Sequence, residues 1–204
     1  MVGRLPLPVI ALAAAFLLLA LGILLNATAP ETAVNVSVAK GGPTLPAFRL
    51  VDQFGDPVTD RDVIGKPSLF FFGFTHCPDV CPTVLASLTA SLAKIGTDGD
   101  RLKIYFVTVD PDRDTSPVLR AYLSSFDSRI RGLTGSTVEI AKLAKALGIY
   151  FARADAGGKN YTVDHSAIVV QVDTRGRFFG TIAFDEAPDT IVEKMKRLVR
   201  EGSR

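Results

Sequence analysis

The sequence is poor in the residues that build metal clusters and cross-linked scaffolds. Its 204 residues include two cysteines, two histidines and two methionines, and no tryptophan. Two cysteines are too few for a disulfide-rich domain. Two histidines leave a four-ligand zinc site incomplete unless carboxylates contribute. The cysteines, Cys77 and Cys81, are close in sequence, which leaves a redox pair, a metal-binding pair or one small structural disulfide.

An excess of charge of one sign is also lacking. Lys and Arg total 23, Asp and Glu total 21, and the net charge is +2, with no long run of like charge. A dedicated nucleic-acid-binding protein would show a basic patch or stripe. The sequence therefore predicts no nucleic-acid partner. It also has no internal repeat, and its length suits one medium domain with a short additional segment.

The N-terminus carries a long apolar run. Arg4 is the only charged residue before Glu31, and residues 8–25 are all apolar or glycine. As a helix, this run would span about 27 Å, close to the roughly 30 Å of a bilayer's hydrocarbon core. We therefore expect residues 1–25 to form a single transmembrane anchor. Arg4 favours a cytoplasmic N-terminus, with the rest of the chain outside.

A cleaved signal peptide is the alternative, because Ala27-Thr28-Ala29 resembles a cleavage site. We favour the anchor, since the apolar run exceeds an ordinary signal core and Pro30 would follow the cut. Residues 26–44 are expected to be a linker and residues 45–204 the folded domain. No Arg- and Ser-rich transit peptide precedes the anchor, so we expect a bacterial inner membrane with the domain in the periplasm.

The apolar pattern after residue 45 predicts alternating strands and helices. Strands are expected at 47–51, 53–58, 68–74, 102–109, 131–134, 149–153, 167–173 and 177–183, and helices at 83–95, 116–126, 136–147 and 187–201. Residues 68–74 are apolar on both faces, as in a central strand. Residues 156–160 are expected to be an insertion-like turn. The order predicts an α/β fold, a thioredoxin-like three-layer sandwich with a mixed central sheet and extra N-terminal strands.

Two helix starts carry capping signals. Ser116 could cap a helix with Pro117 at its first position. Ser136 and Glu139 are spaced as a capping box.

Cys77 follows the strand at 68–74 and stands at the start of a helix. The free N–H groups and partial positive charge of a helix N-terminus favour a thiolate there. Cys81, one helical turn later, is expected on the same face. Two such sulfurs can close a disulfide or bind one soft metal ion. Thiolate ligands favour Cu(I) and imidazole accepts either oxidation state, so copper fits best.

The two histidines are unequal candidates for a further ligand. His165 precedes the strand at 167–173, and in a thioredoxin-like sheet this loop would face the start of the cysteine helix. We expect it to be a ligand, the plain alternative being a satisfied surface or core histidine. His76 adjoins Cys77 and is the weaker candidate, because its side chain can point away. Asp164 could orient His165 through its other ring nitrogen.

Three blocks of sequence resemble one known family. Residues 75–83, Thr-His-Cys-Pro-Asp-Val-Cys-Pro-Thr, resemble the signature of the SCO/SenC proteins, copper-binding factors for cytochrome c oxidase assembly. Residues 110–115 and 164–166 resemble the second and third blocks of that family, and the resemblance covers roughly residues 45–200. It implies that Cys77, Cys81 and His165 bind copper, as Cu(I), Cu(II) or both, and that one anchor holds the domain at a membrane.

The resemblance also implies a partner. Proteins of this family deliver copper to the dinuclear centre of oxidase subunit II, or reduce the cysteines of that subunit beforehand. The sequence leaves open whether the acceptor is that subunit or another copper-site protein.

Other functions compete with copper delivery. A general thiol–disulfide oxidoreductase has the strand–Cys–helix arrangement but uses C-x-x-C, and thioredoxins place a cis-proline where this chain has none between Pro117 and Pro188. An inert domain with a structural disulfide is disfavoured, because so short a loop removes little chain entropy. A peroxidase would need Thr75 and Arg113 around the cysteine. We expect the acidic run at 110–114 to shape a loop and not to bind a hard cation.

Overall fold

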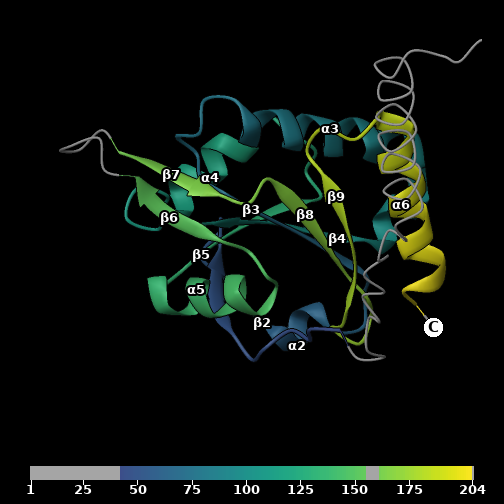
Figure 1. The fold of residues 1–204 in the computed structure, drawn as a ribbon, viewed down its shortest axis with the longest axis horizontal. Coiled ribbons are helices and arrows are strands. Elements are labelled where there is room, and N and C mark those ends of the chain that lie inside the picture. Colours follow the sequence, from purple (N-terminus) through teal and green to yellow (C-terminus); the bar gives the residue numbers. More distant parts are fainter. Residues whose placement is uncertain (1–41, 155–160, 204) are drawn as a thin grey trace, which may run out of the picture. The chain divides into compact units, whose positions relative to one another are not determined.

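The computed structural model describes residues 42–154 and 161–203 (Figure 1). The elements, in chain order, are β1 (Arg49–Asp52), β2 (Pro57–Thr59), α2 (Asp60–Val63), β3 (Ser68–Gly73), α3 (Val80–Ile95), the 3₁₀ helix η1 (Gly96–Arg101), β4 (Lys103–Thr108), α4 (Ser116–Leu123), β5 (Ile130–Thr134), α5 (Thr137–Ala146), β6 (Phe151–Ala154), β7 (Thr162–His165), β8 (Ile168–Val172), β9 (Phe178–Ala183) and α6 (Pro188–Glu201). The predicted anchor, most of the linker and the turn at 156–160 lie outside the described residues.

Seven strands form one mixed sheet in the order β2-β1-β5-β4-β3-β8-β9, and β6 pairs with β7 in a separate hairpin. β3 runs parallel to β4 and antiparallel to β8, which makes it an interior strand of the sheet. Every residue of β3 is buried. The predicted α/β fold with a mixed central sheet and a two-sided central strand is therefore confirmed.

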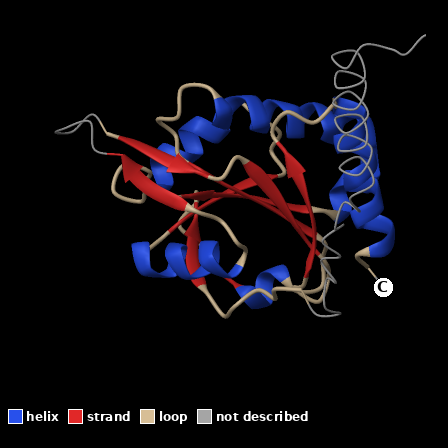
Figure 2. Ribbon diagram, viewed as in Figure 1, coloured by secondary structure: helices blue, strands red, loops and turns tan. Residues whose placement is uncertain are grey.

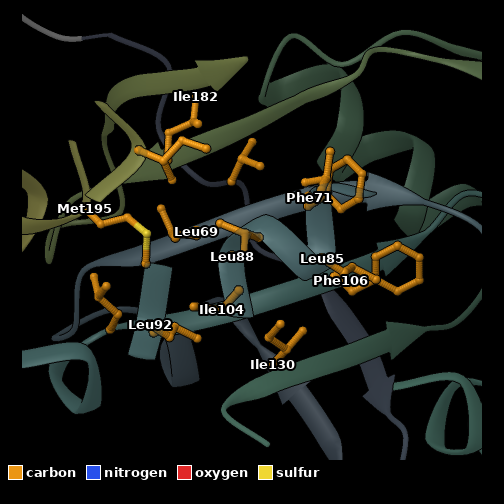
Figure 3. Packing of buried hydrophobic residues seen from close by; sticks show 14 of the residues in the cluster. Leu69, Phe71, Leu85, Leu88, Leu92, Ile104, Phe106, Ile130, Ile182 and Met195 are labelled. Atoms are coloured by element: carbon orange, nitrogen blue, oxygen red, sulfur yellow. The ribbon is translucent and has the colours of Figure 1, made fainter. Parts of the chain in front are cut away.

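Separate sets of helices cover the two faces of the sheet, as Figure 2 shows. Side chains alternate along a strand, so Leu69 and Phe71 of β3 enter one core cluster while Phe70 and Phe72 enter the other. The first cluster also contains side chains of α3, α4 and α6, and the second contains side chains of α2 and α5. Figure 3 shows the first cluster, with leucines of α3 packed on β3 and β4. Each fully buried Phe or Leu side chain stabilises the folded state by about 1.5–3 kcal/mol relative to an exposed one.

Helix α3 starts earlier than its apolar spacing predicts, at Val80, so it includes Cys81. The Thr83 N–H donates to the Asp79 carbonyl, which closes the first turn. Pro82 is tolerated there because first-turn N–H groups have no intrahelical partner. The apolar spacing did not show this turn, because its polar and proline residues interrupt the period, although the spacing of Cys77 and Cys81 indicated a helical turn.

One described stretch, Val80–Arg101, is long and apolar enough to cross a membrane by length and composition. It comprises α3 and η1. Leu85, Leu88 and Leu92 of α3 are buried in the first core cluster, so packing on the sheet accounts for its apolar character.

Several boundaries and caps differ from those expected. Thr115, not Ser116, is the N-cap of α4, and the helix ends at Leu123 instead of residue 126. Ser136 caps α5 by accepting the Glu139 N–H, but the Glu139 carboxylate accepts the Arg49 N–H instead of completing a capping box. The elements α2, η1 and β7 were not predicted, because each carries at most one apolar residue besides glycine and therefore shows no hydrophobic period.

Candidate metal centre

Strand directions bring the two cysteines and His165 to one edge of the sheet. β3 and β4 are parallel, so the loops that follow them leave the sheet at the same edge. β8 is antiparallel to β3 and therefore begins at that edge. His165 ends β7, just before β8, instead of lying in a loop as the sequence indicated. The β6–β7 hairpin, in which Phe151 pairs with His165, fixes its backbone.

The three side chains converge. One donor atom from each of Cys77, Cys81 and His165 can be chosen so that all three lie within 4.8 Å of one another, and among the described residues this is the one such His, Cys, Asp or Glu group. The Cys81 Sγ lies 3.5 Å from the His165 Nε2. The Cys81 N–H donates to the Cys77 Sγ at 3.4 Å. Both cysteines are free thiols.

The donors differ in burial. Cys81 is fully buried, whereas Cys77 and His165 are partly exposed. Burial raises the pKa of the Cys81 thiol. Burial also lowers the pKa of His165, against smaller opposing effects of the Ser166 carbonyl and the Asp164 charge. Both effects favour neutral side chains without metal, so a cation would displace the proton of Cys81 when it binds.

The carbonyl oxygen of Ser166, not Asp164, orients the imidazole. The Nδ1 of His165 lies 3.2 Å from that oxygen, and a carbonyl can only accept, so Nδ1 carries the proton and Nε2 presents its lone pair to Cys81. The Asp164 side chain is exposed. The edge of the His165 ring meets the buried Phe74 ring at 5.9 Å between centroids. This corrects the expectation that Asp164 would hold the ring.

The second histidine lies outside the group. The His76 side chain is 53% exposed, and its Nδ1 is 3.1 Å from the Thr75 hydroxyl and 3.9 Å from Asp114. It makes no part of the donor group formed by the described residues.

Comparison with known proteins agrees with this geometry. The sequence model of the SCO1/SenC family matches residues 37–200. The chain belongs to the SCO1/SenC family. Its thioredoxin-like fold is the one expected from the resemblance of the three sequence blocks.

Individual SCO proteins resemble the chain over most of its length. Mitochondrial SCO2 of Saccharomyces cerevisiae is 37% identical over 168 residues, which are 80% of this chain and 54% of the yeast protein. The SCO2-like protein of Rickettsia felis is 34% identical over 87% of this chain and 89% of its own length. The structure of Bradyrhizobium japonicum ScoI with copper bound is 40% identical, with a TM-score of 0.71 over 76% of this chain and 99% of that one. The chain thus spans about half of the yeast relative and nearly all of the two bacterial ones.

The donor set of this SCO1/SenC domain fits a soft metal ion. Bonds of about 2.0–2.3 Å to a three-coordinate ion would place the donors about 3.5–4.0 Å apart. The Cys81–His165 separation of 3.5 Å already meets that distance, and no pair exceeds 4.8 Å. Two thiols and one imidazole, without a carboxylate, are donors that Cu(I) prefers over hard cations.

A buried carboxylate holds the cysteine loop of this domain. Asp114 is fully buried and accepts the backbone N–H of Thr75 at 2.9 Å, the Thr75 hydroxyl at 2.6 Å and the Thr108 hydroxyl at 2.7 Å. The carboxylate therefore joins the loop after β3 to the end of β4. The acidic run at 110–114 shapes these loops, as expected, and forms no metal-ligand group among the described residues.

The neighbouring Asp110 is occupied in a similar way. It accepts from the Arg113 Nε and from the Tyr161 hydroxyl at 2.6 Å, and the Arg113 guanidinium lies 3.7 Å from the centre of the Tyr161 ring. These contacts tie the start of the β7 segment to the loop after β4. Thr75 and Arg113, the residues that a peroxidase would direct at its cysteine, instead hydrogen-bond to aspartates.

Sequence reasoning missed two residues that contact this region. Gly73 ends β3, and a Cβ there would lie 2.6 Å from the Cys81 Sγ. The buried hydroxyl of Tyr122 has no hydrogen-bond partner among the described residues. A glycine at the end of an otherwise bulky apolar strand was a visible signal of a close approach, whereas nothing in the sequence distinguished Tyr122 from a core residue.

Proposed function

We propose that this chain binds one copper ion through the Sγ atoms of Cys77 and Cys81 and the Nε2 of His165, and delivers it to the copper centre of cytochrome c oxidase. The observation that carries the proposal is the convergence of these three soft donors at one sheet edge. A family member with copper bound, ScoI of Bradyrhizobium japonicum, supports it. Thiolates suit Cu(I), and the imidazole allows Cu(II) as well.

The uneven burial of the donors suits transfer. Cys81 lies at the bottom of the site, and Cys77 and His165 are partly exposed. A partner's ligand would approach from the exposed side and displace His165 and Cys77 before Cys81. Copper would then pass by ligand exchange without release into solution. We propose subunit II of the oxidase, or another copper-site protein, as the acceptor.

We further propose that residues 1–25 anchor the chain as a single helix in the bacterial inner membrane, with the domain in the periplasm. The uncharged run at 8–25 and the preceding Arg4 support this. Such a location would keep the domain beside a membrane-embedded oxidase.

A second function, thiol–disulfide exchange with the acceptor, is favoured by the paired free cysteines. Their sulfurs lie within 4.8 Å, one helical turn apart, and Cys77 is the more exposed. The Cys77 thiolate would attack a disulfide of the acceptor and release one acceptor thiolate. Cys81 would then attack the mixed disulfide, which leaves the acceptor reduced by two electrons and this chain oxidised.

Replacing His165 separates the two functions, because thiol exchange needs both cysteines but not the imidazole. Genes encoding the full-length chain with His165→Ala, Cys77→Ser or the control His76→Ala would replace the natural gene in its own host. Cu(I) affinity of each purified chain and the copper-centre absorption of the host oxidase would be measured. If the chain delivers copper, His165→Ala should lose both its Cu(I) affinity and the copper-centre absorption of the oxidase. His76→Ala should keep both. If His165→Ala assembles the oxidase normally while Cys77→Ser does not, the chain acts as a thiol reductase instead.

A further inference from the structure

Tyr122 of α4 carries a polar group that the described structure leaves unpaired. Its hydroxyl oxygen is buried and has no hydrogen-bond partner. Buried polar groups are nearly always hydrogen-bonded, and a missing partner is costly. A phenylalanine would fill the same space without that cost. The hydroxyl is therefore available to donate to an acceptor that forms when the neighbouring site is loaded.

The Tyr122 ring packs on neighbours that it shares with Cys81. The Tyr122 ring packs against Phe106 at 5.8 Å between centroids. Phe106 and Cys81 both lie against Gly73. A Cβ added to Gly73 would be 2.8 Å from the Phe106 ring and 2.6 Å from the Cys81 Sγ. Tyr122 packs on the same core cluster that contains Cys81.

Electrostatics agree with this placement. Burial raises the pKa of Tyr122, and negative charge on Cys81 and then on Cys77 raises it further. Charge on either sulfur therefore disfavours loss of the Tyr122 proton, so the hydroxyl stays a donor. Among the two, Cys81 is the buried one, away from competing water.

We propose that the Tyr122 hydroxyl donates a hydrogen bond to the Cys81 sulfur when copper is bound there, and that this bond sets the balance between Cu(I) and Cu(II). A neutral thiol is a weak acceptor, whereas a metal-bound thiolate carries charge that a buried O–H donor can stabilise. Hydrogen bonds to a cysteine ligand are a recognised control on copper potential. The inference rests on the proposed copper site at Cys77, Cys81 and His165.

The direction of the effect follows from the charge on sulfur. Cu(I) withdraws less charge from the thiolate than Cu(II) does, so the hydrogen bond stabilises the Cu(I) form more. In the full chain, Tyr122→Phe should lower the ratio of Cu(I) to Cu(II) affinity by up to about tenfold, the limit reached if the hydrogen bond to the charged sulfur forms with Cu(I) alone. A tenfold change corresponds to a copper potential about 59 mV lower. The sulfur-to-Cu(II) absorption band should move to lower energy.

The control is Tyr105→Phe, which removes a hydroxyl from a tyrosine of the other core cluster. It should leave potential and absorption unchanged. The metal-free chain gives a second test: Tyr122→Phe should be at least as resistant to denaturant as the natural sequence, because the lost hydroxyl was unpaired. Loss of stability in the metal-free chain with an unchanged potential would overturn the proposal, since Tyr122 would then be a structural residue.

One measurement needs no variant. In the natural chain, the Cζ carbon resonance of Tyr122 should shift on Cu(I) loading while that of Tyr105 stays in place. An unmoved Tyr122 resonance in a copper-loaded chain contradicts the hydrogen bond. Failure of the natural chain to bind copper at all would instead contradict the proposed function.

Discussion

Gly73→Ala is the substitution that most directly links packing to the candidate metal site. Gly73 is buried at the end of β3, beside the start of α3. An added Cβ would lie 2.6 Å from the Cys81 Sγ and 2.8 Å from the Phe106 Cε2, where ordinary contacts begin at 3.4 Å. Cys81 and Phe106 are themselves fully buried, so neither has free space to move into.

The expected magnitude has two parts. Forcing a methyl group into a packed core costs about 1–3 kcal/mol of stability. The Cys81 sulfur must also give way, although metal–ligand bonds tolerate deviations of only about 0.2 Å. We therefore expect the Cu(I) affinity to fall about 10–100-fold, as it does when the support of a ligand is disturbed.

The assay compares Gly73→Ala with Gly135→Ala in the full-length chain. A Cβ at Gly135 would lie 2.8 Å from the Leu50 Cδ2, in the core cluster on the other face of the sheet. Denaturant unfolding without metal should show similar losses for both variants. Competition with a Cu(I) chelator should show weaker binding for Gly73→Ala alone. Equal and unchanged affinities would refute the idea that Gly73 makes room for the sulfur.

Two further predictions follow from hydrogen-bonded carboxylates. Asp114→Asn places an N–H₂ group among three donors, so it should lower the free energy of unfolding in denaturant by about 1–3 kcal/mol and weaken Cu(I) binding. The control Asp112→Asn, at an exposed position, should change neither quantity. Equal behaviour of the two variants would contradict the role of Asp114. Hydrogen bonds from Arg129 hold the pKa of Asp127 below its ordinary 3.8. This pair therefore stabilises the fold above about pH 4, and its contribution is lost as the pH falls through the lowered pKa of Asp127 in the folded state. Urea midpoints measured from pH 7 to 3 should therefore fall less for Asp127→Asn than for the natural sequence, and parallel curves would contradict the assignment.

Periodicity predicted the long elements of this fold well. The continuous apolar run of β3 reflects burial on both faces of that strand. The helical spacing of apolar residues in α6 reflects burial on one face of that helix. The elements α2 and β7 were missed, because each has one apolar residue and so displays no period. Boundaries near prolines were also misplaced, as at Val80 and Thr115.

The sequence pointed to the three candidate donor residues but not to the groups that position them. Cys77 and Cys81 are recognisable from local spacing, and His165 from topology together with the family resemblance. The Ser166 carbonyl that orients His165 could not be inferred, because backbone groups leave no trace in composition. The roles proposed for Gly73 and Tyr122 depend on how both pack against Phe106 of another strand, which only the packed structure reveals.

The most direct test of the central claim is X-ray absorption of the Cu(I)-loaded full-length chain, which counts the atoms bonded to copper. A copper site made by Cys77, Cys81 and His165 predicts two sulfur scatterers and one nitrogen scatterer for the natural sequence and for His76→Ala. It predicts two sulfurs without that nitrogen for His165→Ala. A spectrum of the natural chain without two sulfurs, or one unaltered by His165→Ala, would contradict a single copper site made by Cys77, Cys81 and His165.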